Sequence, residues 1–289
     1  MLKRIVREYR ISLKDTAVEE VVDLIFFRPL AFILVKAIYR FPITPNQLSV
    51  LSMIAGIVSG VFYAIGNRQG FLMGGLFYGL AHVLDCCDGM IARLKNCGTP
   101  IGRIVDGWTD YVTGTAVYIG LLIGLLNSSL LLPASPWVLM IPAAIFLAIH
   151  SMVVDYYRLE FLAHGLGKAN SIREDMETFS RHMEQLKKEK GHYLEILLLA
   201  FYLGYTRIQV KHAKPGKKYA MAGYYDANKR LVFLWNWIGA ATHIFVLIVA
   251  SLLYEPNLFF FYILGVANVW MLIMGFIQIK TNRHILVMS

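Results

Sequence analysis

Four aspartates stand close together in a strongly apolar part of the chain: Asp85, Asp88, Asp106 and Asp110. Like charges a few ångströms apart in a low-dielectric site cannot all stay ionised without compensation. Divalent cations are the simplest compensation, and carboxylates without a His or Cys ligand cluster suit Mg²⁺, Mn²⁺ or Ca²⁺. Two such ions about 4 Å apart, bridged by carboxylates, are a known arrangement for phosphoryl chemistry. The four aspartates are therefore candidate metal ligands.

The residues around the first two aspartates add a phosphate-binding character. In a helix, at about 100° per residue, Asp85 and Asp88 lie within about 60° of each other. Gly89 and Ala92 fall on the same face, with Arg93 at its edge. The small residues leave room for a substrate beside the carboxylates, and the arginine supplies a fixed positive charge for a phosphate.

The other two aspartates follow on a second helix. Gly102, Asp106 and Asp110 are spaced by four and so step along one stripe. The link between the two helices is short and contains Gly98 and Pro100, so the helices must be antiparallel neighbours whose acidic faces can meet. Two metals, a shelf of small residues and an arginine together suggest a diphosphate ligand.

The elements that position these residues are predicted to be membrane spans. The chain has 289 residues, of which 57% are hydrophobic and only 16% charged, against about 25% charged in a soluble domain. A span needs about 20 mostly apolar residues, and six segments qualify. They are residues 47–65, 70–94, 101–126, 136–163, 231–253 and 258–279. We therefore expect an all-α polytopic membrane protein.

The apolar segment 21–40 is harder to assign, because Arg28, Lys36 and Arg40 interrupt it. An amphipathic helix in the interface plane, with basic side chains toward lipid headgroups, fits better than a seventh span. The expected organisation follows as four parts. These are an N-terminal arm and juxtamembrane helix (1–40), four spans with the aspartates (41–163), a basic cytoplasmic insertion (164–230), and two spans with a tail (231–289).

The distribution of basic residues predicts the orientation. With six spans both termini lie on one side, and of 28 Lys and Arg only Arg68 falls on the opposite side. The positive-inside rule therefore places the termini and the aspartates at the cytoplasmic face. The net charge of +9 suits anionic lipid or phosphate ligands, and a basic loop starting at Lys211 is expected to contact lipid. Nucleic-acid binding is a weaker interpretation, because the basic residues lie between spans rather than on a basic, aromatic-rich domain.

The aspartate region resembles a known family. The pattern Asp85-x2-Asp88-Gly89-x2-Ala92-Arg93-x8-Gly102-x3-Asp106-x3-Asp110 is similar to the signature of the CDP-alcohol phosphotransferases at every fixed position. Thr44-Pro45-Asn46-Gln47-Leu48-Ser49 resembles the opening of that family's first span. The resemblance implies six spans preceded by an interfacial helix, an active site at the cytoplasmic face, and a homodimer. The insertion is not covered by it.

The resemblance also implies a reaction and residue roles. A CDP-linked donor gives its substituted phosphate to an alcohol and CMP leaves, with two Mg²⁺ or Mn²⁺ ions. Asp85, Asp88 and Asp106 would be the main metal ligands, and Asp110 would be the general base with a metal close by. The nucleotide and diphosphate site would comprise Asn46, Ser49, Asp88, Gly89, Ala92, Arg93 and Gly102.

The alcohol is less defined. The usual membrane donor is CDP-diacylglycerol, with inositol phosphate, glycerol phosphate or serine as acceptor; CDP-choline or CDP-ethanolamine with diacylglycerol is the alternative. A phosphorylated acceptor needs further cations, for which Arg103, Arg158 and Lys168 are available. The stretch Asp155-Tyr156-Tyr157-Arg158 loosely resembles one in phosphatidylglycerol-phosphate and phosphatidylinositol-phosphate synthases, without their further arginine and glutamate. A phosphorylated polyol is slightly favoured.

Simpler explanations exist for each residue. The aspartates could be helix caps or salt-bridge partners, but acids inside a membrane are costly and usually functional. Arg93 could pair with Asp88 or Asp106, and Arg158 could be an interface residue whose head reaches water. Cys86 and Cys87 lie off the Asp85 face, so zinc or redox roles are not expected. A divalent-metal transporter is the rival of another class, but it would place its ligands near the bilayer midplane with repeat symmetry.

Overall fold

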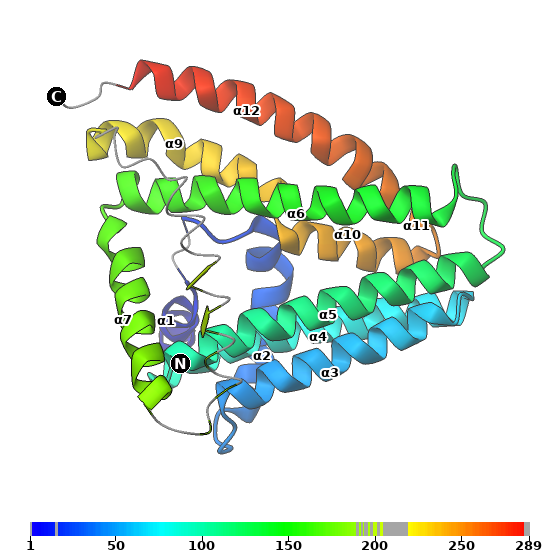
Figure 1. Ribbon diagram of the computed structural model, residues 1–289, viewed down its shortest axis with the longest axis horizontal. Coiled ribbons are helices and arrows are strands. Elements are labelled where there is room, and N and C mark those ends of the chain that lie inside the picture. The colour runs from blue at the N-terminus through cyan, green and yellow to red at the C-terminus, as the bar shows by residue number, and fades with distance from the viewer. Residues whose placement is uncertain are drawn as a thin grey trace. The chain divides into compact units, whose positions relative to one another are not determined.

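The computed structural model of the chain is built from helices (Figure 1). It describes residues 2–14, 17–188 and 219–285, with a few single residues between 191 and 204. The shorter N-terminal elements are α1 (Leu2–Ser12), the π-helical turn η1 (Asp23–Phe27) and α2 (Arg28–Ile38). The long elements that follow are α3 (Pro45–Ala64), α4 (Arg68–Lys95), α5 (Pro100–Asn127) and α6 (Pro136–Glu160). The remaining elements are η2 (Phe161–Gly165), α7 (Ala169–Lys188), α9 (Met221–Trp235), η3 (Asn236–Ile238), α10 (Ala240–Leu253), α11 (Pro256–Phe260), η4 (Phe261–Val266) and α12 (Ala267–His284).

Six helical stretches of the described chain are long and apolar enough to cross a membrane. They are Pro45–Ala64, Arg68–Lys95, Ile104–Asn127, Pro136–Gly165, Met221–Leu253 and Pro256–His284. The expected all-α class with six spans after shorter N-terminal helices is thus confirmed. The fifth stretch differs in one respect, because it begins at Met221 rather than Leu231 and includes the short 3₁₀ turn η3.

Local sequence signals explain where the helices near the aspartates begin. Thr44 accepts a hydrogen bond from the Gln47 backbone, and the Gln47 side chain accepts one from the Thr44 backbone, which forms a capping box ahead of α3. Thr99 caps α5 through the Gly102 backbone N–H at 3.0 Å. These caps fix the ends of α3 and α5 beside the aspartates.

Helices α3, α4 and α5 lie side by side (Figure 1), with α3 packed along both of the others. The crossing of α3 and α5 is close enough to require glycine. A Cβ added to Gly120 would collide with the Gly60 backbone, and one at Gly124 would collide with the Tyr63 carbonyl. Small residues are the usual means by which membrane helices approach closely. This packing fixes the position of α5, which carries Asp106 and Asp110.

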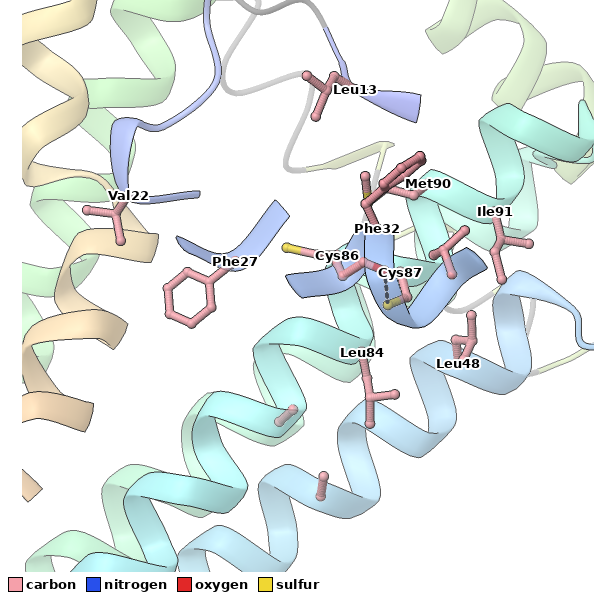
Figure 2. Close-up of a cluster of buried hydrophobic side chains, with 14 residues drawn as sticks. Leu13, Val22, Phe27, Phe32, Leu48, Leu84, Cys86, Cys87, Met90 and Ile91 are labelled. Carbon is pink, nitrogen blue, oxygen red and sulfur yellow. Dashed lines mark hydrogen bonds between the residues drawn. The ribbon is translucent and has the colours of Figure 1, made fainter. Parts of the chain in front are cut away.

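The N-terminal helices pack against α4 through a buried apolar cluster (Figure 2). Cys86, Cys87, Met90 and Ile91 are among its members from α4, and Phe32 and Ala31 are among its members from α2. The Cys87 thiol lies 3.4 Å from the Ala31 carbonyl. The two cysteines are therefore packing residues, and the cluster holds the end of α4 that bears Asp85 and Asp88.

The chain divides into two compact units. Residues 1–151 with 236–271 form the first, and residues 152–235 with 272–289 form the second. In the second unit Tyr157 and Trp235 stack at 4.6 Å between ring centroids, and the Trp235 indole N–H donates to Gln278 Oε1 at 3.1 Å. All four aspartates lie in the first unit. The expected basic loop starting at Lys211 lies outside the described residues.

Candidate active site

Three of the four aspartates form one cluster at the meeting of α4 and α5. One carboxylate oxygen each from Asp85, Asp88 and Asp106 lies within 4.8 Å of the others. Among the described residues, the buried Asp85 Oδ1 has no hydrogen-bond partner. A buried carboxylate oxygen without a donor is costly unless a cation compensates it. Oxygen-only donors at this spacing are the set that hard divalent cations prefer, so the cluster fits a metal site.

Hydrogen bonds from neighbouring elements shape the nucleotide side of this cluster. The Ser49 hydroxyl, on α3, donates to Asp88 Oδ2, which is itself buried. A Cβ added to Gly102 would lie 3.1 Å from both Asn46 Oδ1 and Thr99 Oγ1. The glycine therefore lets the α3 and α5 termini approach each other here. Ser49 thus contacts Asp88 from the first span and Asn46 lines the smaller cavity, while their role in nucleotide binding stays a prediction.

Two adjoining cavities open onto the cluster. The larger has a volume of about 660 Å³, and the smaller one of about 80 Å³ lies toward the start of α3. Both are lined by Asp88, Gly89, Ala92 and Asp106. The larger cavity is within the range of small-molecule sites, about 300–1,000 Å³. The small residues at positions 89 and 92 leave this space open next to the carboxylates.

Arg93 lies on the rim of the larger cavity. Its guanidinium nitrogens would be 3.3 Å from a Cβ at Gly89, and its Nε donates to the Ser12 carbonyl at 2.5 Å. The buried Nη2 has no hydrogen-bond partner among the described residues. An anchored guanidinium with a free N–H group suits a phosphate oxygen. This geometry favours ligand binding over a simple ion pair with Asp88 or Asp106.

Asp110 lies at the edge of the cluster, with its carboxylate next to that of Asp85. It follows Asp106 by one turn of α5, it is solvent-exposed, and it lines neither cavity. Its carboxylate still repels those of Asp106 and Asp88. An aspartate at the edge of a cation cluster is free to accept a proton, whereas the three clustered acids are suited to hold cations. The division of roles among the four aspartates stays a prediction.

The acceptor-binding role of Arg103, Arg158 and Lys168 stays a prediction. Arg103 lies in α5, but its side chain is not among the described ones. Arg158 and Lys168 belong to the second unit, whereas the aspartates belong to the first. Arg158 Nη1 lies 3.3 Å from Asp155 Oδ1, and Lys168 is exposed.

Two basic residues that the sequence analysis did not select line the larger cavity: Lys14 and Arg28. Arg28 was expected to point toward lipid headgroups, but it is buried and its Nε lies 3.2 Å from Glu19 Oε2. The expectation failed because a single basic residue in an apolar segment looks the same whether it reaches lipid or a buried carboxylate. The nearby Glu19 was the sequence feature that indicated a possible ion pair for Arg28.

A second group of metal-binding residue types lies behind the aspartates. Asp23, His82 and Cys86 each offer one atom within 4.8 Å of the others. The pair formed by His82 Nε2 and Asp23 Oδ1, at 2.9 Å, joins η1 to α4. Because the histidine is already paired with the aspartate, we interpret this group as packing.

The fold and the site together define a multi-pass membrane protein with a carboxylate cluster that could hold a metal next to a basic cavity. The sequence profile of the CDP-alcohol phosphatidyltransferase family matches residues 42–178. This segment is a little under half of the chain and contains every residue of the Asp85–Asp110 pattern. Over this segment the chain is similar to this family.

Three curated relatives each match half of the chain or less. A phosphatidylinositol phosphate synthase of Corynebacterium glutamicum is 30% identical over 83 residues, covering 29% of this chain and 37% of the relative. A phosphatidylinositol phosphate synthase of Mycobacteroides abscessus is 27% identical over 149 residues, covering 50% and 62%. A CDP-diacylglycerol–inositol 3-phosphatidyltransferase of Candida albicans is 35% identical over 80 residues, covering 27% and 33%. The chain thus spans between one third and less than two thirds of the length of these relatives.

Proposed function

We propose that this chain is a phospholipid-synthesis enzyme that transfers a phosphatidyl group from CDP-diacylglycerol to an inositol-type alcohol and releases CMP. The observation that supports this most is the cluster of Asp85, Asp88 and Asp106 beside the larger cavity. It lies inside the segment that matches the family. The named relatives act on inositol or make an inositol phospholipid, which favours this alcohol class.

Divalent cations fit the acidic cluster. Asp85, Asp88 and Asp106 would hold them, with Asp110 close by, and Mg²⁺ or Mn²⁺ match the all-oxygen donor set. When bound, such ions stabilise the negative charge of the phosphoryl transition state and of the leaving CMP. The orphaned oxygen of Asp85 supports this assignment independently of the family.

The chain's own side chains orient the donor. Ser49 donates to Asp88 and so fixes the direction of that carboxylate. Asn46, Gly102 and the smaller cavity form the nucleotide side, while Arg93 donates to a diphosphate oxygen through its free Nη2. Gly89 and Ala92 keep the space between them open. Binding of this kind holds the reacting phosphorus close to the acceptor hydroxyl, which is a large part of phosphoryl-transfer catalysis.

Asp110 is proposed to take the proton. The acceptor oxygen forms a bond to the phosphatidyl phosphorus, the bond from that phosphorus to the CMP oxygen breaks, and the hydroxyl proton moves to the Asp110 carboxylate. A base of this kind must lie within hydrogen-bond reach of the hydroxyl. The exposed position of Asp110 at the edge of the cluster suits an acceptor that enters from water.

The membrane arrangement is part of the same proposal. The active site faces the cytoplasm, because nearly all basic residues lie on the side of the chain that also holds the aspartates. The enzyme acts as a homodimer, as the family resemblance implies. The donor enters from the bilayer and the polar alcohol from the cytoplasm, so the reaction takes place at the cytoplasmic leaflet.

The experiment uses purified full-length protein in detergent or nanodiscs with labelled CDP-diacylglycerol and Mg²⁺ or Mn²⁺. The acceptors compared are inositol, inositol phosphate, glycerol phosphate and serine, with release of CMP and the lipid product both measured. A parallel reaction contains CDP-choline and diacylglycerol. We expect metal-dependent CMP release with an inositol-type acceptor and none with Asp88→Asn. Absence of CMP release from every donor, with metal movement across vesicles instead, would identify the transporter alternative.

A further inference from the structure

The larger cavity has a basic side as well as an acidic one. Lys14, Arg28 and Arg93, called here the basic wall, line the cavity that Asp85, Asp88 and Asp106 also line. We infer that Lys14, held in place by the N-terminal segment, binds the phosphate of a phosphorylated alcohol acceptor. This inference rests on the proposed function and adds that the acceptor carries a phosphate group.

One buried carboxylate organises the N-terminal side of this wall. Glu19 Oε1 accepts a hydrogen bond from the Lys14 backbone N–H at 2.9 Å, and its Oε2 accepts one from Arg28 Nε at 3.2 Å. Both Glu19 and Arg28 are buried, at 6% exposure each. Arg28 Nη1 also donates to the Cys86 carbonyl at 3.4 Å, which connects the segment to α4. Lys14 is therefore fixed at its backbone next to the cavity.

The three basic side chains differ in the N–H groups that remain available to bind a ligand. Arg28 is neutralised by Glu19, and Arg93 uses its Nε on the Ser12 carbonyl. The Lys14 side chain is exposed, and its ammonium has no hydrogen-bond or ion-pair partner in the part of the chain that the structure describes. An exposed ammonium held at the mouth of a cavity is free to bind a phosphate as a point charge.

The position of Lys14 relative to Asp110 assigns this phosphate to the acceptor. Lys14 lines the same cavity as Asp106, and Asp110, the proposed base for the acceptor hydroxyl, follows Asp106 by one turn of α5. Arg93, in contrast, lies against Gly89 and next to the metal-binding cluster, where the donor diphosphate must lie. A phosphate near Lys14 thus belongs to the molecule whose hydroxyl is next to Asp110. The ligand class is a phosphomonoester of a small polyol, such as inositol phosphate or glycerol phosphate.

The test compares Lys14→Gln with Lys14→Arg, and with Arg10→Gln as the matched control. Arg10 is an exposed basic residue on α1 that does not line the cavity. For each protein the KM for inositol phosphate is divided by the KM for inositol, with kcat and the KM for CDP-diacylglycerol measured in parallel. We expect Lys14→Gln to raise this ratio about tenfold or more, since a hydrogen bond to a charged group is lost. Lys14→Arg should restore most of it, and Arg10→Gln should leave it at the wild-type value.

The alternatives give different results. A Lys14→Gln ratio equal to wild type overturns the inference, and so does a change confined to the donor KM, which would assign the charge to the donor diphosphate. A fall in kcat alone, with the ratio unchanged, would make Lys14 a residue that acts on Asp110 and also overturns it. If wild-type protein releases no CMP with any acceptor, the proposed function itself fails. If it transfers only to unphosphorylated alcohols, the inference about Lys14 fails alone.

Discussion

The two faces of α4 use neighbouring residues for opposite purposes. The active face, comprising Asp85, Asp88, Gly89 and Ala92, lines the larger cavity and keeps a buried oxygen without a partner. The packed face, comprising Cys87, Met90 and Ile91, is buried under the N-terminal helices (Figure 2). One face keeps polar groups unsatisfied for a ligand, and the other fills its space with apolar atoms. Changes to the two faces should therefore separate activity from stability.

The largest expected effect comes from the acidic cluster that the active face completes with α5. Asp106→Asn removes one negative charge from the three clustered carboxylates, so divalent cations should bind more weakly and the transition state should lose stabilisation. We expect kcat/KM for CMP release to fall by about 10²–10³-fold or more. Thermal unfolding measured by intrinsic fluorescence should change little, because removing a charge relieves repulsion among the acids. An unfolded or uninserted variant would contradict the separation of the two faces.

Asp110→Asn tests the proton-transfer role apart from cation binding. The amide is close in size to the carboxylate and cannot accept the proton, so turnover should fall by about 10²-fold or more. The concentration of Mn²⁺ that gives half-maximal binding, measured by calorimetry, should change less than in Asp106→Asn, since Asp110 lies outside the three-acid group. Full turnover would remove Asp110 from the mechanism. Equal losses of metal affinity in both variants would make Asp110 a ligand instead.

The packed face should respond in the opposite way. Met90 is fully buried, and Met90→Ala leaves a cavity beneath α2. The expected loss of stability is about 2–5 kcal/mol, measured as a lower Tm in detergent. Activity per folded molecule should stay within about twofold, because Met90 does not touch either cavity. A large loss of kcat with an unchanged Tm would show that the packed face also adjusts the active face.

The sequence predicted the active face more completely than the residues around it. Spacing by three and four placed Asp85, Asp88 and Gly89 on one side of a helix, because helical periodicity depends only on sequence separation. The sequence did not predict that Lys14 and Arg28 line the cavity. Their approach to α4 depends on a turn and on the buried Glu19, and helical periodicity indicates neither. The roles of Arg158 and Lys168 in acceptor binding stay predictions, because they lie in the other compact unit.

The smallest expected effect is that of pH on the stability of α1, where it meets α2 behind the packed face. Lys36 Nζ lies 2.7 Å from Glu8 Oε2, and Arg4 Nε lies 2.9 Å from Glu8 Oε1. The hydrogen bonds from Lys36 and then from Arg4 lower the pKa of Glu8 below its ordinary value of 4.5. A lowered pKa means that this carboxylate stabilises the folded state above pH 4.5 and that its contribution is lost as the pH falls through the lower folded value.

Hydrogen exchange of the α1 backbone therefore provides the measurement. Between pH 5 and pH 3, wild-type α1 should lose slightly more protection than Glu8→Gln, after correction for the intrinsic exchange rate at each pH. The difference should be small and should decrease in high salt, because the pair is at the surface. The amides of Met90 and Ile91 should not respond, since their cluster is apolar. A matching loss of protection at Met90 would mean that the packed face depends on α1 charge as well as on buried apolar area, and would narrow the contrast between the two faces.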